Sequence, residues 1–259
     1  MLGISGGCYG VAMADAELRL APLPDVPGRL TEQVMEAVRA ALDAGVMRPG
    51  IKYSVYQIAD ALGVSRTPVR DALLRLEEIG LIRFEARQGF RVLLPDPREI
   101  TDIFAIRLVL ELPACSRAAA VCDTGLAARL EHRMDVLRTA AIAGDERTFA
   151  HHDQLLHDHI MEAAGNARAR TIVRSLREST RLLGATTGRA RSLCDIDAEH
   201  HPVVAAIIGK NPNAAAESMR AHLSATGRIL VSQAILDQGS SLDAEELWAL
   251  AAQRDGPSY

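Results

Sequence analysis

The sequence predicts a mainly α-helical protein of two domains, and three observations lead to this fold class. Apolar residues repeat at helical spacing twice between residues 54 and 80, and two short strand-like segments follow. From residue 98 onward the chain shows helical segments and no convincing strand pattern. A length of 259 residues with 48% hydrophobic content is enough for two domains with globular cores.

The first domain is expected at residues 24–94, after a loose N-terminal tail at residues 1–23. The tail lacks the basic segment and the sustained apolar stretch of a secretory signal. A first helix is expected at residues 28–44, because its apolar side chains share one face. These side chains are Leu30, Val34, Val38 and Leu42. The shared face predicts that this helix packs against the two helices that follow.

Two helices joined by a tight turn come next. Apolar residues of the first helix repeat at Val55, Ile58, Ala59 and Leu62. Gly63 breaks this helix, and Ser65 is placed to cap a second helix that begins near Arg66. Pro68 lies in the first turn of the second helix, where the backbone N–H groups have no partner within the helix. The turn therefore separates two packed helices.

The second helix has two different faces. Its apolar face is formed by Val69, Ala72, Leu73 and Leu76. On another face Arg66 and Arg70 stand four residues apart, with Thr67 beside them. One face is expected to pack, and the other is free to read a groove of DNA.

Gly80 is the expected end of the second helix, and strands are expected at residues 81–84 and 90–94. The loop between them, residues 86–89, would form a wing. A helix-turn-helix followed by a hairpin is typical of a winged DNA-binding module. On the pattern alone, an ordinary helical pair followed by a hairpin is about equally well supported.

The run GVSRTPVRDAL from Gly63 to Leu73, with Arg75-Leu76-Glu77 and Gly80-Leu81 after it, resembles the recognition region of the GntR superfamily of bacterial transcription regulators. The resemblance implies a winged helix-turn-helix that binds double-stranded DNA as a homodimer on a two-fold symmetric operator. By this resemblance, base and phosphate contacts in the major groove are made by Ser65, Arg66, Thr67 and Arg70. Gln88 and Gly89 match wing residues that approach the minor groove.

The charge distribution agrees with DNA binding once it is considered locally. The whole chain has a net charge of −4. Residues 48–91 carry eight Lys and Arg against five Asp and Glu, a local balance of +3, which leaves −7 for the remainder. The positive charge therefore lies where DNA phosphates would be.

The second domain is expected to be all-helical at residues 98–237, after a linker at residues 95–97. Its six helices are expected at about residues 98–121, 125–143, 145–164, 167–187, 196–209 and 213–236. With only 3% aromatic residues in the chain, aliphatic side chains must fill this core. Residues 238–259 are expected to be a C-terminal tail that contains a short amphipathic segment with Trp248.

Membrane and extracellular roles are disfavoured. The chain has no run of eighteen apolar residues, so nothing in it is expected to span a membrane. Its four cysteines have no C-x-x-C spacing, which argues against a zinc ribbon or a redox motif. Free thiols in a cytoplasmic protein are the expected state.

Histidines are concentrated in the second domain, where seven of the eight lie between residues 151 and 222. Asp153 and His157 are four residues apart, so they project from one helix face and can hold one divalent transition-metal ion. Helical spacing places His200 and His222 on inward faces of two later helices. The alternative is that His200 and His222 are core histidines satisfied by hydrogen bonds and that the histidines from 151 to 159 lie on a solvated face.

The order Asp153-x-x-x-His157, then Glu199-His200, then His222 resembles the FCD effector domain of the FadR branch of the GntR superfamily, in its six-helix, VanR-like form. The resemblance implies that Asp153, His157, His200 and His222 bind a divalent metal, with zinc or nickel favoured. His201 competes with His200 for one position. Arg107 matches an arginine that would pair with the carboxylate of a small organic-acid effector. The alternative for Arg107 is an ion pair with Glu111, four residues later.

These expectations combine into a ligand-responsive transcription regulator, usually a repressor, in which an organic acid at the metal changes the placement of the two winged modules. An enzyme is not expected, because no separate catalytic constellation is present. Glu199, the acidic residue next to a ligand, should point about 100° away along its helix. A metal-dependent enzyme and a pure metal sensor on the same scaffold are the alternatives.

Overall fold

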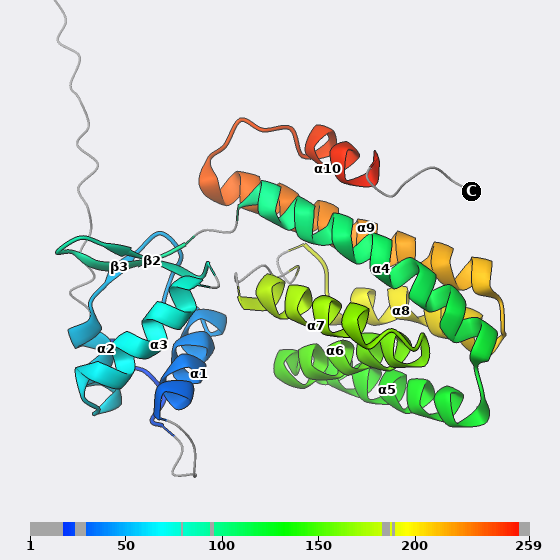
Figure 1. Ribbon diagram of the computed structural model, residues 1–259, viewed down its shortest axis with the longest axis horizontal. Coiled ribbons are helices and arrows are strands. Elements are labelled where there is room, and N and C mark those ends of the chain that lie inside the picture. Colours follow the sequence, from blue (N-terminus) through cyan, green and yellow to red (C-terminus); the bar gives the residue numbers. More distant parts are fainter. Residues whose placement is uncertain are drawn as a thin grey trace, which may run out of the picture. The chain divides into compact units, whose positions relative to one another are not determined.

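The computed structural model describes residues 18–23, 30–78, 80–93, 96–182, 187 and 190–253. It confirms the mainly α-helical fold class, with one small sheet (Figure 1). The chain divides into two compact units, Met1–Leu94 and Pro95–Tyr259. Of the expected N-terminal tail, residues 1–17 lie outside the described part of the chain, and residues 18–23 have no regular secondary structure.

The first unit contains the helix-turn-helix and hairpin in the predicted order. Its elements are α1 (Leu30–Asp43), β1 (Lys52–Tyr53), α2 (Val55–Leu62), α3 (Arg66–Glu78), β2 (Ile82–Glu85) and β3 (Gly89–Val92). Side chains from every helix fill its core, among them Val34, Ile58 and Leu73, all fully buried. Helix α3 begins at Arg66, as predicted.

The hairpin is part of a three-stranded sheet, which corrects the prediction of two strands. Strand β1 pairs antiparallel with β3, so that Tyr53 faces Phe90 and the strand order is β1-β3-β2. The sequence did not reveal β1 because two residues are too short to show alternation. The wing is therefore anchored to a second strand besides its own partner.

Local sequence explains the turn between α2 and α3. Ser54 and Gln57 form a capping box at the start of α2, in which each side chain accepts a hydrogen bond from the other residue's backbone N–H. Gly63 ends the helix with φ of 66° and donates its N–H to the Ala59 and Asp60 carbonyls. A left-handed backbone at this position favours glycine.

The second unit is entirely helical within the described residues. Its helices are α4 (Pro97–Val121), α5 (Thr124–Ala143), α6 (Glu146–Ala163), α7 (Ala167–Leu182), α8 (Leu193–Ile208), α9 (Pro212–Gln238) and α10 (Ala244–Gln253). Helix α4 begins within the expected linker, because Asp96 caps it and Pro97 occupies its first turn. The expected end of α7 at residue 187 differs from the observed Leu182, and residues 183–186 lie outside the described part.

Helix α10 lies within residues 238–259, which were expected to be a C-terminal tail with a short amphipathic segment. It packs against α4 and α9, the two long helices that lie side by side in Figure 1. Its Trp248 is only 1% exposed and contacts Phe104 edge to face, with ring centroids 6.0 Å apart. The unit thus has seven helices in the described residues, one more than predicted. Residues 254–259 lie outside them.

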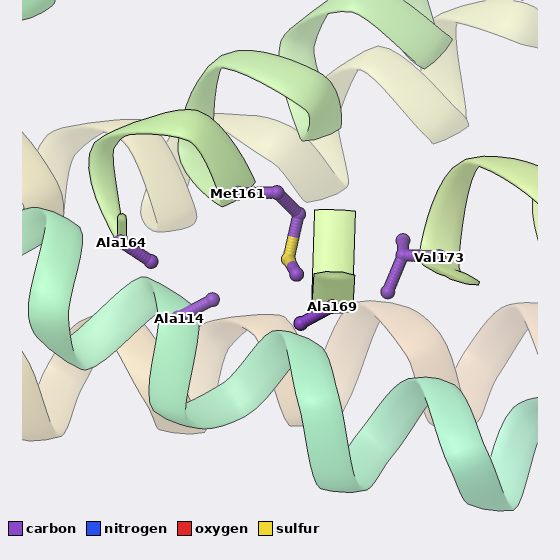
Figure 2. Packing of buried hydrophobic residues seen from close by; sticks show 5 residues of the cluster. All are labelled: Ala114, Met161, Ala164, Ala169 and Val173. Atoms are coloured by element: carbon purple, nitrogen blue, oxygen red, sulfur yellow. The ribbon is translucent and has the colours of Figure 1, made fainter. Parts of the chain in front are cut away.

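Small side chains bring α4, α6 and α7 close together beside the histidine-rich region. Figure 2 shows this buried cluster, which consists of Ala114, Met161, Ala164, Ala169 and Val173. Ala114 lies one turn beyond Glu111 on α4, and Met161 lies one turn beyond His157 on α6. The cluster therefore fixes the separation of α4 and α6 next to these two polar side chains.

None of the described helices is both long enough and apolar enough to cross a membrane. Three cysteines in the described residues are free; Cys115 and Cys122 are buried, and Cys194 is exposed. Cys8 lies outside the described part.

Candidate metal centre and DNA-binding face

Helix α3 keeps one polar face free. Its buried residues are Val69, Ala72, Leu73 and Leu76. Arg66, Thr67 and Arg70 are exposed on the helix, and Ser65 is exposed just before it. All four predicted major-groove residues are therefore accessible on the surface of this unit.

The wing has a shape that its sequence enforces. Gly89 has φ of +90°, and a Cβ atom there would overlap the Tyr53 carbonyl oxygen of β1. Arg87 also adopts a positive φ, of 61°. Exposed Gln88 accepts a hydrogen bond from Lys52 Nζ, and Lys52 also pairs with Glu85 at 2.5 Å. The predicted minor-groove residues Gln88 and Gly89 are therefore held at a wing fixed by β1.

Three buried histidines from three different helices converge in the second unit. They are His157 of α6, His200 of α8 and His222 of α9, with exposed fractions of 1%, 0% and 6%. One ring nitrogen from each lies within 4.8 Å of the others. Asp153, one turn before His157, places Oδ1 3.0 Å from His200 Nε2 and 3.7 Å from His157 Nε2. The four residues predicted as ligands thus form one cluster.

Several polar atoms in this cluster are buried without a hydrogen-bond partner in the protein. They are Asp153 Oδ1, His157 Nε2 and both ring nitrogens of His200. Although Asp153 Oδ1 lies close to His200 Nε2, the pair lacks the alignment of a hydrogen bond. Buried polar atoms are nearly always paired, so this concentration requires an explanation. The alternative of core histidines satisfied by hydrogen bonds does not describe His200, whereas His222 has a hydrogen-bond partner in Glu199.

Glu111 of α4 orients His157. Its Oε2 accepts a hydrogen bond from His157 Nδ1 at 2.5 Å, and its Oε1 accepts one from Arg107 Nε at 2.7 Å. Because Nδ1 donates to the carboxylate, Nε2 keeps its lone pair toward the cluster. Arg107 is thus engaged in the intrahelical ion pair that was the alternative to effector binding. All three side chains are buried.

Two further partners orient Asp153 and His222. Arg177 of α7 donates to Asp153 Oδ2 at 2.5 Å, which leaves Oδ1 toward the histidines. His222 Nδ1 donates to Glu199 Oε2 at 3.0 Å. Glu199 is itself paired with Arg191, whose guanidinium also donates to a threonine hydroxyl on α9 at 2.7 Å. An outer shell of this kind is typical of ligands held ready for a metal.

Burial sets the protonation of the cluster. It lowers the pKa of His157 from 6.5 to about 4, and it lowers the pKa of His222 well below 6.5. Burial alone would raise the pKa of Asp153, but Arg177 and His200 hold it well below its ordinary range. At neutral pH His157 and His222 are therefore neutral imidazoles and Asp153 is an ionised carboxylate, the forms that bind divalent transition metals.

The remaining histidines of the region are placed differently. The side chain of His201 is 43% exposed and lies near Asp197 and Arg138. His152 and His159 contact Arg133 of α5 through ring nitrogens. His151 is exposed, whereas His152 and His159 are partly buried. His200 rather than His201 faces the cluster.

Sequence reasoning missed most of the outer shell. It treated Glu111 only as an ion-pair partner of Arg107, left Arg177 unassigned and did not consider Arg191. It placed Glu199 away from the ligands, whereas the structure gives it a direct hydrogen bond to His222. The sequence signal that could have identified Glu111 is its place within the otherwise apolar residues 108–115, because a charged residue is rarely buried unless it is paired.

An open hollow of about 400 Å³ borders the cluster between α8 and α9. Its lining includes Glu199 and His222 together with small side chains of α9 such as Ala221 and Ala225. It has room for a small molecule beside His222.

Two family descriptions match successive parts of the chain. "Bacterial regulatory proteins, gntR family" matches residues 30–92, and "FCD domain" matches residues 102–225. A transcriptional regulator of Agrobacterium vitis, encoded in the TAR-I ttuE-ttuC' intergenic region, is 32% identical over 132 residues, which cover 49% of this chain and 77% of that protein.

Two further relatives cover more of the chain. The probable D-xylose utilization operon transcriptional repressor of Paenarthrobacter nicotinovorans is 26% identical over 76% of this chain and 86% of its own length. The solved structure of E. coli McbR/YncC has a TM-score of 0.63 at 24% identity and covers 80% of this chain and 99% of that one. The structural match supports the fold, and the sequence matches support the family.

Proposed function

The chain belongs to the gntR family of bacterial regulatory proteins, with an FCD domain after its winged helix-turn-helix, and on this premise we propose that it is a repressor controlled by a metal-bound organic acid. As a member of this family it is a DNA-binding transcriptional regulator and not an enzyme. Repression is favoured because a relative that spans most of the chain is named a transcriptional repressor.

Ser65, Arg66, Thr67 and Arg70 are proposed to contact the operator in the major groove, with Gln88 and Gly89 at the minor groove. The exposure of the four residues at and just before the start of α3, and of Gln88 on the wing, supports this assignment. Arg66 and Arg70 are the residues best suited to bidentate contacts with guanine, since their guanidinium groups are forked donors. A homodimer would place two such faces on a two-fold symmetric operator.

Asp153, His157, His200 and His222 are proposed to hold one divalent ion, with zinc or nickel favoured. The observation that carries this proposal is the group of buried, unpaired atoms on Asp153, His157 and His200. The outer-shell partners and the lowered histidine pKa values support it further. When bound, the ion would supply a Lewis-acidic position for one carboxylate oxygen of a ligand.

Arg107, whose Nε pairs with Glu111, is proposed to bind the effector carboxylate through its remaining guanidinium donors, together with Arg177. Burial lowers the pKa of Arg107, and the nearby Arg177 guanidinium lowers it further. Arg177 Nε is buried without a hydrogen-bond partner. A guanidinium group can bind a carboxylate through two parallel N–H donors. Effector binding would then change the spacing of the two winged modules in the dimer and weaken operator binding. A tenfold change in operator affinity needs only about 1.4 kcal/mol of differential binding.

The test is operator binding by the full-length protein, measured with zinc and with chelator across a panel of small hydroxy and dicarboxylic acids. Genomic DNA fragments selected by the protein supply the operator. The proposal expects at least one acid to release the operator only when the metal is present. Release by metal alone would identify a pure metal sensor. Release by an acid in metal-free protein would contradict the metal-bound effector.

A further inference from the structure

The C-terminal helix is connected to the candidate metal centre by a continuous line of contacts. Trp248 of α10 meets Phe104 of α4 edge to face, with ring centroids 6.0 Å apart. Phe104 presents a ring face to the Arg107 guanidinium, whose central carbon lies 4.7 Å from the ring centroid. Arg107 holds Glu111, and Glu111 holds His157 Nδ1.

We infer that α10 is a positioning element for the metal centre, in which Trp248 fixes Phe104 and thereby the Arg107 and Glu111 pair that orients His157. This inference rests on the proposed metal site. Phe104 is fully buried and Arg107 is almost so, which leaves neither side chain room to move independently. In a buried setting, a guanidinium over an aromatic face is a strong, directional contact.

The slot for Trp248 is a specific feature of α9. Gly227 lies in the middle of this helix, and a Cβ atom there would overlap the indole ring and lie 3.0 Å from Phe104 Cδ1. The guanidinium carbon of Arg228, the next residue, lies over the Trp248 ring, 5.8 Å from its centroid, and Arg228 pairs with Glu245 of α10. A helix-interior glycine is unfavourable by itself, so its presence is explained by the space that it leaves.

Gly227→Ala is therefore a small perturbation that displaces Trp248 and replaces none of the candidate metal ligands. Gly125→Ala is the matched control, because a Cβ at Gly125 in α5 meets its neighbours only at ordinary contact distances of 3.5 and 3.7 Å. Three readouts apply: Trp248 emission, the zinc dissociation constant against a competing indicator, and the visible absorption bands of bound cobalt(II). The chain has one tryptophan, so the emission reports on α10 alone.

Gly227→Ala should shift the emission to longer wavelength, weaken zinc binding about tenfold and alter the cobalt bands, as loss of an outer-shell partner does. Gly125→Ala should match the wild type in all three. A shifted emission with unchanged zinc affinity and cobalt bands would overturn the inference.

The wild type provides a second arm that needs no variant. Coupling is reciprocal, so zinc titrated into metal-free protein should change Trp248 emission in proportion to the bound metal. Zinc uptake without an emission change would overturn the role of α10 while leaving the metal site intact. A wild type that binds no zinc would overturn the proposed function itself, and the inference with it.

Discussion

Replacing His200 with leucine should raise the stability of the metal-free protein and abolish its stabilisation by metal. His200 is fully buried, and neither ring nitrogen makes an aligned hydrogen bond. Asp153, 3.0 Å from His200 Nε2, keeps its hydrogen bond from Arg177 in the variant. An unsatisfied buried polar group costs about 1–3 kcal/mol, and leucine removes that cost at similar volume. For a protein of this size, the gain corresponds to about 2–4 °C in Tm per kcal/mol.

The assay is thermal unfolding of wild type and His200→Leu in chelator and in zinc at a hundredfold excess over Kd. Zinc should stabilise the wild type by about 2.7 kcal/mol and leave His200→Leu unchanged. For any gain from leucine below about 2.7 kcal/mol, the two proteins should exchange rank between chelator and zinc. His201→Leu is the control, because this neighbouring side chain is partly exposed and should leave the zinc effect intact. A His200→Leu protein less stable than wild type in chelator would refute the reasoning.

Three other outcomes are expected. In a gel-shift titration, Arg70→Ala should weaken specific operator binding by about 1–3 kcal/mol and leave the dimer and the metal content unchanged. Arg75→Ala, which removes an equal charge near the end of α3, should weaken the binding of all DNA sequences alike. Arg177→Met should lower zinc affinity ten- to a hundredfold in a competition assay, since Asp153 loses its orienting partner; unchanged affinity would exclude that role. Burial lowers the pKa of His157 from 6.5 to about 4, so the unfolded chain takes up this proton at a higher pH than the folded chain. The free energy of unfolding of metal-free protein, measured with urea, should therefore fall by an amount on the order of 3 kcal/mol as pH falls from 6.5 to 4. A free energy of unfolding that does not change with pH would contradict this prediction.

The parts of the fold that sequence predicted correctly depend on local chemistry. The turn at Gly63 and the start of α3 at Arg66 follow from a left-handed glycine and a helical repeat, which act over a few residues. Strand β1 was missed because it exists only through its pairing with β3, about forty residues away. Helix α10 was visible as an amphipathic segment, but its docking depends on a slot at Gly227 that α4 and α9 form together.

The candidate site divides in the same way. Asp153 and His157 share a helix face, so their proximity follows from spacing, and the apolar neighbours of His200 predicted its burial. The partners of these residues come from distant segments: Glu111 lies 46 residues before His157, and Arg177 lies 24 residues after Asp153. Only the packing of α4, α6 and α7 brings them together, and no local pattern encodes it.

The metal content of the untagged protein, purified without chelator and measured by inductively coupled plasma mass spectrometry, tests the central claim most directly. The account predicts about one divalent transition-metal ion per chain, lost when His157 and His222 are both replaced by alanine. The absence of metal in the wild type, with none taken up on titration with zinc or nickel, would contradict it.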